Sequence, residues 1–359
     1  MGRGEPDEGA CPRLGFYNSG GLSLPTTSSR SRILTSSPAT IHALDLIQPD
    51  MLRVDEVIDE RLTSEVPLVR EVAQYIISSG GKRLRPALLL LMSGALGSQH
   101  PLRHSLAAVV EFIHTATLLH DDVVDESTLR RGRETANERF GNAASVLVGD
   151  FLYSRAFQMM VDVDNMRVMQ VLSEATNVIA EGEVMQLMNM HDASLNEADY
   201  LRVIRSKTAK LFEASARLAP ILAGSDAQTE ALCATYGQAL GTAFQVIDDV
   251  LDYEGDSEVL GKNLGDDLRE GKVTLPIICA LKTATDPQKS LIRTAITQGD
   301  KTHLEEILGI IRSSGALDLA RASASAEAQR AMEAARLLPS NAYSDALLQL
   351  AGGLLERRS

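Results

Sequence analysis

Two aspartate clusters, each at the end of an apolar stretch with helical spacing, constrain this chain of 359 residues more than any other feature. The first is DDVVD, residues Asp121–Asp125, and the second is DDVLD, residues Asp248–Asp252. The outer aspartates of each cluster are four residues apart and share one helix face, where like charges destabilise a helix by about 0.2–0.5 kcal/mol. A divalent cation between the carboxylates would remove that repulsion.

The repetition of the cluster favours a metal site over an ordinary acidic helix end. A solvated helix end explains a single cluster as well as a metal does. Two clusters, well over a hundred residues apart, instead favour two helices that face each other across a cavity and hold magnesium at its mouth. Magnesium takes one or two protein carboxylates and completes its shell with water and phosphate oxygens. The candidate metal ligands are Asp121, Asp125, Asp248 and Asp252, and Asp122 and Asp249 join them as catalytic candidates.

Basic residues stand out locally against a net charge of −13. The segment SGGKRLRPALL places Lys82 and Arg85 where a glycine loop leads into a helix that we expect to open at Pro86, and a helix N-terminus beside cations binds anions. A P-loop is excluded, because the glycines do not match its pattern and no strand precedes them. Arg130 and Arg131 follow the first cluster, where a metal-bound diphosphate needs a cationic partner.

Side chains able to hold a second anion lie further along the chain. The segment IRSKTAKLF carries two lysines and a hydroxyl, a glutamine shares a helix face with the second aspartate cluster, and two lysines follow in glycine-bearing loops. These loop lysines are either point-charge phosphate binders or ordinary loop charges. The candidates are Lys207, Thr208, Lys210, Gln245, Lys262 and Lys272.

His114 lies two turns before Asp121 on the same stripe of an apolar helix. A single histidine in such a helix is more often a packed residue than a catalyst. Its place on the aspartate stripe favours a role as a hydrogen-bond donor to a diphosphate.

Helical spacing of apolar residues runs almost throughout from Ile41 onward, without a convincing alternating strand pattern. We predict one all-α domain at 41–359, a single large helical bundle around a central apolar cavity. Residues 1–40, rich in Gly, Ser and Pro, are predicted to be a disordered extension. The expected helices include Met51–Ser79, Pro86–Ala95, Ser105–His120, Ala143–Met160, Val168–Met190, Ala198–Ala216, Ala227–Asp252 and Thr274–Thr283, with a further start at an Asp286 N-cap before Pro287.

The composition excludes several classes of protein. The acidic net charge opposes a general nucleic-acid surface. The three cysteines, Cys11, Cys233 and Cys279, are odd in number and far apart, which fits a reducing compartment and indicates neither a disulfide framework nor a zinc site. The longest apolar run, Pro86–Met92, is far shorter than the ~20 residues that span a bilayer, and no signal-peptide core follows the start. We therefore expect a soluble, cytoplasmic protein that can still make transient contact with a membrane.

Two carboxylate sets and two separate groups of cations imply two anionic groups in one site. No Ser-His-Asp or Cys-His arrangement is evident, so no covalent nucleophile is required. Metal-assisted departure of a diphosphate fits these residues, with magnesium and basic side chains stabilising the charge on the leaving group. An apolar helical interior would hold the carbon skeleton and keep water from a cationic intermediate.

These motifs resemble those of the trans-prenyltransferases, the polyprenyl diphosphate synthases of the isoprenoid synthase fold. The similar segments are GGKRLRP, FIHTATLLHDDVVDESTLRRG, FGNAASVLVGDFL, GEVMQL, SKTAKLF, GTAFQVIDDVLDY and GKNLGDDLREGKVTLP, which span roughly residues 45–359 in family order. The amino-acid sequences of these segments are most similar to those of bacterial octaprenyl diphosphate synthases.

The resemblance implies a magnesium-dependent elongation of an allylic diphosphate, farnesyl being the expected primer, by isopentenyl diphosphate. It also implies a homodimer and an octaprenyl product for a ubiquinone side chain. Isopentenyl diphosphate would be bound by Lys82, Arg85, His114 and Arg131, magnesium by Asp121, Asp125, Asp248 and Asp252, and the allylic diphosphate by Arg130, Lys207, Thr208, Gln245 and Lys262.

Product length would be set by the residues below the first aspartates. Ala116 and Thr117 are small and leave room where a bulky side chain would form a floor, which argues against a short product. Met159 and Met160 are candidates for a deeper floor.

The alternative functions are those of a shorter-chain, geranylgeranyl-type synthase, a class I terpene cyclase, and a non-catalytic synthase subunit. A helical calcium-binding protein is opposed by the missing D-x-[DN]-x-[DN]-G spacing.

Overall fold

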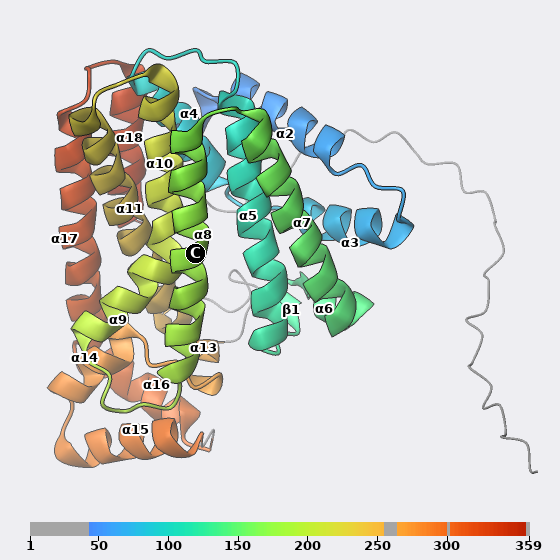
Figure 1. Ribbon diagram of the computed structural model, residues 1–359. Helices are drawn as coiled ribbons and strands as arrows, with labels where there is room; N and C mark the ends of the chain where they lie inside the picture. The colour runs from blue at the N-terminus through green and yellow to red at the C-terminus, as the bar shows by residue number, and fades with distance from the viewer. Residues whose placement is uncertain (1–42, 255–263, 300–301, 357–359) are drawn as a thin grey trace, which may run out of the picture. The chain divides into compact units, whose positions relative to one another are not determined.

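The computed structural model describes residues 43–254, 264–299 and 302–356, which form helices joined by short loops (Figure 1). The all-α prediction is confirmed, because the β structure in these ranges is limited to one hairpin of two-residue strands, β1 (Leu129–Arg130) and β2 (Arg133–Glu134). The proposed extension at 1–40 lies outside the described residues, so this extension and the boundary at residue 41 stay predictions.

The helices follow one another in a simple order along the chain. They are α2 (Gln48–Arg61), α3 (Pro67–Ser78), α4 (Leu84–Ala95), α5 (Arg103–Val124), α6 (Ala136–Phe140), α7 (Asn142–Asp162), α8 (Met166–Met188), α9 (Glu197–Ile204), the π-helical turn η1 (Arg205–Ala209), α10 (Lys210–Ala223), α11 (Ala227–Glu254), α13 (Asp266–Arg269), α14 (Leu275–Thr283), α15 (Asp286–Gln298), α16 (Leu304–Ser313), α17 (Ala316–Arg336) and α18 (Ala342–Gly353).

Most predicted helices are present with ends shifted by a few residues, but the helix predicted at Met51–Ser79 is wrong. The chain breaks there into α2 and α3, because Pro67 starts a new helix and the preceding Val66 is extended, with φ −87° and ψ 110°. A proline disfavours helical geometry at the residue before it and has no N–H to continue a helix.

Two predicted helix starts are also corrected. α4 begins at Leu84 rather than Pro86, after Arg83 adopts a left-handed conformation with φ 45°. The N-cap of α15 is Thr285 rather than Asp286. Thr285 and Gln288 form a capping box, which fixes the helix start one residue earlier than the Asp-Pro pair suggests.

The segment predicted as one helix at Ala198–Ala216 is interrupted by the π-helical turn η1 and then continues to Ala223. A π-helical turn holds one more residue than an α-helical turn and is frequent at functional sites. In this chain it carries Lys207 and Thr208.

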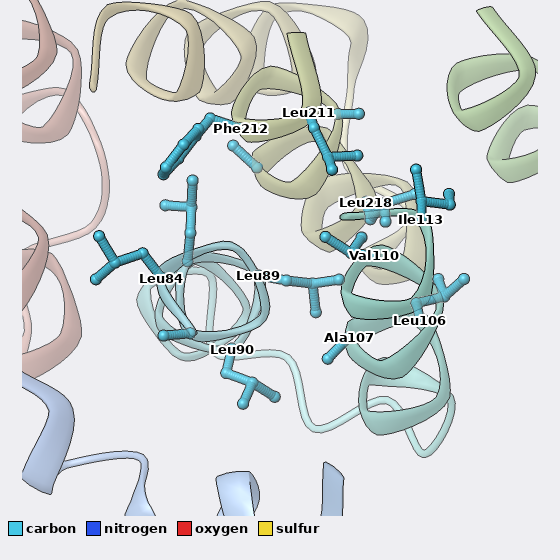
Figure 2. Packing of buried hydrophobic residues seen from close by; sticks show 14 of the residues in the cluster. Leu84, Leu89, Leu90, Leu106, Ala107, Val110, Ile113, Leu211, Phe212 and Leu218 are labelled. Atoms are coloured by element: carbon cyan, nitrogen blue, oxygen red, sulfur yellow. The ribbon is translucent and has the colours of Figure 1, made fainter. Parts of the chain in front are cut away.

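The bundle is built from neighbouring pairs of helices. α11 packs against α17 and α10, α10 against α4, α4 against α5, and α5 against α7. Figure 2 shows side chains of α4, α5 and α10, among them Leu89, Val110 and Leu218, meeting in one apolar cluster. Each fully buried side chain of this size stabilises the fold by about 1.5–3 kcal/mol. The described helices include none that is both long enough and apolar enough to cross a bilayer.

Candidate active site

The first aspartate cluster lies at the C-terminal end of α5, as predicted. The helix ends at Val124, and the backbone N–H of Asp125 still donates to the carbonyl of Asp121, with 2.8 Å between N and O. Asp121 and Asp125 therefore keep the shared stripe that their spacing predicted. Both side chains are half-buried.

Asp122 has a different environment from its neighbours. Its side chain is fully buried, and its Oδ1 accepts from Arg130 Nε at 2.9 Å and from Nη2 at 2.7 Å. Burial alone would lower the pKa of Arg130, but hydrogen bonding and charge attraction from Asp122 outweigh it and raise the pKa. The short hairpin of β1 and β2 brings Arg130 back onto α5 for this contact. Asp122 thus fixes Arg130 and is turned away from the stripe of the outer aspartates.

Lys207 reaches the first cluster from the π-helical turn. Its Nζ lies 2.5 Å from Glu183 Oε2 and 3.6 Å from Asp121 Oδ2. Burial would lower the pKa of Lys207, but Asp121 and Glu183 raise it, so the ammonium stays charged. Burial, followed by repulsion from Asp121, raises the pKa of Glu183 to about 7.

A glycine allows this approach of the π-helical turn to α8. A Cβ atom on Gly182 would lie 2.6 Å from the backbone nitrogen of Lys207, closer than side chains tolerate. Gly182 therefore lets the two backbones pack directly. Lys210, which the sequence grouped with Lys207, instead pairs with Glu174 at 3.0 Å and Glu213 at 3.1 Å, so the structure does not bring it to the site.

The second cluster lies in the last turns of α11. Asp248 is exposed, Asp252 is half-buried, and Asp249 is buried. The backbone N–H of Asp267, in α13, donates to Asp252 Oδ2 at 3.3 Å. In both clusters, therefore, the first and last aspartates (the outer pair) are more exposed than the middle, inner aspartate, which is buried.

Lys272 joins the two clusters. Its Nζ lies 2.8 Å from Asp125 Oδ2 and 2.7 Å from Glu270 Oε2, and its backbone N–H donates to the carbonyl of Asp267 at 2.8 Å. Asp267 in turn contacts Asp252, so one lysine and one short helix connect the ends of α5 and α11. The premise that the clusters face the same region is supported by this chain of contacts, and Lys272 is no ordinary loop charge.

A separate basic group surrounds His114. The Nη1 of Arg85 lies 3.1 Å from Nε2 of His114, and the Arg85 guanidinium lies over the ring of Phe212, 4.4 Å from its centre. The guanidinium of Arg131 packs against Gly81, in the same loop as Lys82. Burial lowers the pKa of Arg85 to about 10, which leaves it charged at neutral pH. Arg85, His114 and Arg131 thus lie in one group, in which the two arginines supply the positive charge. The binding of isopentenyl diphosphate by this group stays a prediction.

The structure refines the hydrogen-bonding role of His114. Burial and then the charges of Arg85 and Arg131 hold the pKa of His114 well below its usual range, so the ring is neutral. An arginine only donates, so Nε2 accepts from Arg85 and the ring proton resides on Nδ1. Nδ1 is then the nitrogen able to donate to a diphosphate.

Acidification from pH 7 to pH 5 is expected to destabilise the wild type more than a His114→Gln variant. Below pH 6.5 the unfolded chain gains a proton at His114 that the folded chain does not take up, because the folded pKa is depressed. Each pH unit below 6.5 therefore removes up to about 1.4 kcal/mol of the wild type's free energy of unfolding. Urea unfolding of both proteins at the two pH values measures this, and equal losses would contradict it.

The carboxylates of the four outer aspartates suit a hard cation that binds together with an anionic ligand such as a diphosphate. Within the described ranges, no three acidic, histidine or cysteine side chains converge as a ready-made metal centre. The outer aspartates stand in pairs on α5 and α11 instead, which fits an ion that takes few protein carboxylates and many phosphate or water oxygens. The residues present therefore fit magnesium bound together with a diphosphate.

Some of the predicted residues cannot be placed around the site, and others were missed. Lys262 lies outside the described residues. Met159 and Met160 are fully buried in α7, beside α5, and their role as a floor stays a prediction. Sequence reasoning missed Glu183 as a contact of Lys207, although it stands in the quoted segment GEVMQL, and Tyr200, which no motif marks.

Comparisons with known proteins show the family and the fold of this chain. The polyprenyl synthetase family model matches residues 66–311. The chain is 52% identical to the octaprenyl diphosphate synthase of Escherichia coli over 87% of its own length and 97% of that protein, and 46% identical to an all-trans-nonaprenyl-diphosphate synthase of Rhodobacter capsulatus over 87% and 97%. A crystal structure of a polyprenyl synthase from Caulobacter crescentus, complexed with calcium and isoprenyl diphosphate, matches with a TM-score of 0.87 at 42% identity, covering 89% of this chain and 98% of that one.

The helical bundle, which brings two acidic clusters to one region, and the family match define an isoprenoid synthase fold and a prenyl-transferring enzyme. The chain belongs to the polyprenyl synthetase family.

Proposed function

We propose that the protein is a magnesium-dependent synthase that adds isopentenyl units to an allylic diphosphate, farnesyl diphosphate being the primer, and releases octaprenyl diphosphate for a ubiquinone side chain. The observation that carries the proposal is the link from Asp125 through Lys272 to Asp252, which brings both acidic clusters to one region of the bundle. The octaprenyl product is supported by the 52% identity to the Escherichia coli enzyme. A nonaprenyl product, suggested by the Rhodobacter capsulatus relative, is the competing length.

The two diphosphates would occupy different sides of the site. Lys82, Arg85, His114 and Arg131 would hold isopentenyl diphosphate, since Arg85 contacts His114 and Arg131 packs against Gly81, next to Lys82. Lys207 and Arg130 would hold the allylic diphosphate, with Thr208 and Gln245 beside them. Lys272, charged and in contact with Asp125, would join this second group.

Asp121, Asp125, Asp248 and Asp252 would hold magnesium, which stabilises the negative charge that develops on the departing diphosphate. Lys207 adds a fixed positive charge at the same place, and its ammonium needs no proton transfer to act. The buried pair of Asp122 and Arg130 keeps a guanidinium oriented in the substrate-free enzyme, so little reorganisation is needed during reaction.

The bond changes balance without a residue that attacks the substrate. The C1–O bond of the allylic substrate breaks and diphosphate leaves, the terminal alkene carbon of isopentenyl diphosphate bonds to C1, and a proton from its C2 passes to the released diphosphate. The apolar side chains of the bundle exclude water from the carbocation. Repetition of the cycle lengthens the chain.

The direct test is incubation of the purified chain with magnesium, farnesyl diphosphate and radiolabelled isopentenyl diphosphate, followed by sizing of the dephosphorylated products. A ladder ending at the octaprenyl alcohol supports the proposal. A cyclised hydrocarbon would support a terpene cyclase instead, and no product from the chain alone would support a non-catalytic subunit.

The proposal includes a homodimer. α7 supports it, because Leu147 and Val161 share one helix face and are 67% and 64% exposed. Aliphatic side chains exposed along one helix face suit a partner surface. Light scattering of the purified chain is expected to give twice the mass of 38.7 kDa, and a monomeric mass would contradict this part.

A further inference from the structure

A chain of hydrogen bonds, buried at Tyr200 and Asp249 and partly buried at Gln245, connects α9, α11 and the π-helical turn. The hydroxyl of Tyr200 donates to Asp249 Oδ2 at 2.5 Å, and Gln245 Nε2 donates to Asp249 Oδ1 at 2.7 Å. At the other end, Thr208 Oγ1 donates to Gln245 Oε1 at 2.9 Å. Four side chains from three elements are thus linked in series, and this series is called the Tyr200–Thr208 relay below.

The donors fix the orientation of every member of the relay. Both oxygens of Asp249 accept from a side chain, so neither oxygen can turn outward without leaving a buried donor unpaired. The amide of Gln245 presents its NH₂ to Asp249 and its oxygen to Thr208. Breaking the buried bond between Tyr200 and Asp249 removes a partner from a buried carboxyl oxygen, which is more costly than losing an exposed contact.

The relay ends one residue from Lys207. In the π-helical turn, the side chain of Thr208 points to α11 while that of Lys207 reaches Glu183 and Asp121. Gly182 holds the backbone of this turn against α8 from the other side. The turn is therefore fixed between α8 and the relay, and the position of the Lys207 ammonium depends on both.

We propose that Tyr200 is a positioning residue for the allylic half of the site, an inference that rests on the proposed function. Its hydroxyl holds Asp249, which orients Gln245, which anchors Thr208 and so the turn that carries Lys207. Asp249 accordingly works through the relay and differs in role from the exposed Asp248 beside it. Arg85, His114 and Arg131, the residues proposed to bind isopentenyl diphosphate, share no described hydrogen bond with the relay.

Tyr200→Phe removes the hydroxyl and keeps the ring. Misplacement by about 1 Å at a reacting site can cost as much as 10²-fold in rate. We expect kcat to fall about tenfold and KM for farnesyl diphosphate to rise about fivefold, while KM for isopentenyl diphosphate stays within about twofold. Thr208→Val, at the other end of the relay, should also raise the KM for farnesyl diphosphate, but Thr208 is itself a proposed contact of this substrate, so Tyr200→Phe is the variant that isolates the relay.

The chain offers a matched control in Tyr236. Its side chain is also buried, and its hydroxyl donates to the carbonyl of Leu347 in α18 at 2.7 Å, so Tyr236→Phe likewise removes one buried hydrogen bond. This bond lies outside the relay. A purely structural effect of losing a buried hydroxyl should therefore lower the thermal midpoint of both tyrosine variants without a selective change in the allylic KM.

The test uses three measurements on each variant. Steady-state kinetics give kcat and the KM for each substrate, and thermal unfolding gives the stability. Calorimetry with magnesium and the unreactive farnesyl thiodiphosphate gives the affinity for the allylic analogue. Weaker analogue binding by Tyr200→Phe than by Tyr236→Phe, with isopentenyl KM unchanged, supports the relay. Equal behaviour of the two variants, or equal loss at both substrates, overturns it. Should the wild type fail to condense the substrates, the proposed function fails, and the calorimetric comparison still decides the role of Tyr200. If Tyr200→Phe does not fold, Asp249→Asn, which interrupts the relay at a residue given no substrate or metal contact, is compared with Tyr236→Phe in its place, and equal behaviour of these two variants would overturn the relay.

Discussion

Asp121→Asn is expected to lower kcat by about 10³-fold and to leave the fold intact, whereas Asp122→Asn is expected to destabilise the protein. Asp121 is half-buried on the stripe that meets Lys207, and its carboxylate would hold magnesium. Asparagine keeps its shape and loses the charge on which magnesium binding and charge stabilisation depend. Asp122, by contrast, is fully buried and bound by Arg130 through two nitrogens.

Removing one partner of a buried ion pair leaves the other charge uncompensated, which typically costs 3–5 kcal/mol. Because asparagine still accepts one hydrogen bond from Arg130, we expect Asp122→Asn to lower the free energy of unfolding by about 3 kcal/mol. Urea unfolding and kcat at saturating magnesium, measured on both variants, separate the two effects. If the two variants were equally stable and lost the same amount of activity, the proposed difference in role between Asp121 and Asp122 would be wrong.

The sequence was sufficient wherever the deciding geometry is local. Four-residue spacing puts Asp121 and Asp125 on one stripe whatever surrounds the helix, and the structure keeps that stripe to the end of α5. The same logic failed between α2 and α3, where helical spacing of apolar residues was given more weight than Pro67. A proline inside a periodic pattern changes the backbone even when the pattern continues.

Contacts between distant segments were harder to predict. Lys272 and Asp125 are far apart in sequence, and only the fold shows that they meet. The π-helical turn has no signal in RSKTA, so Lys207 and Lys210 looked like one cationic pair although they diverge to Asp121 and to Glu174. Tyr200 lies outside every quoted motif, and its partner Asp249 looked equivalent to Asp248 until burial separated them.

The charge arrangement explains why the first acidic cluster is tolerated in this structure. Lys207 lies against Asp121 and Lys272 against Asp125, and both ammonium groups have raised pKa values because nearby carboxylates outweigh burial. Repulsion within the first cluster is thereby offset by two lysines from other elements. These same lysines are then in place to contact a diphosphate, so one set of charges serves both the stability of the fold and the proposed chemistry.

Ala116→Phe is expected to shorten the product by several isoprene units, as is Thr117→Phe. Thr117 lies one turn below Asp121 on the same stripe, half-buried, and its hydroxyl donates to the carbonyl of His114 at 2.7 Å. A phenyl ring at this position would project into the path of a chain that grows away from the aspartates. Ala116 is fully buried one residue earlier, where a ring would narrow the same path from its wall.

Product sizing, together with thermal unfolding of each variant, shows whether these positions border space for the growing chain or lie in a close-packed helix interface. If space for the growing chain borders Ala116, phenylalanine fills it and the product shortens while the protein stays stable. If the side chain instead faces a close-packed helix interface, the added ring overpacks it and costs about 1–3 kcal/mol of stability without changing product length. That second outcome at both residues would refute their assignment to chain length. At Ala116 alone it would leave Thr117, on the aspartate stripe, as the residue that borders the growing chain.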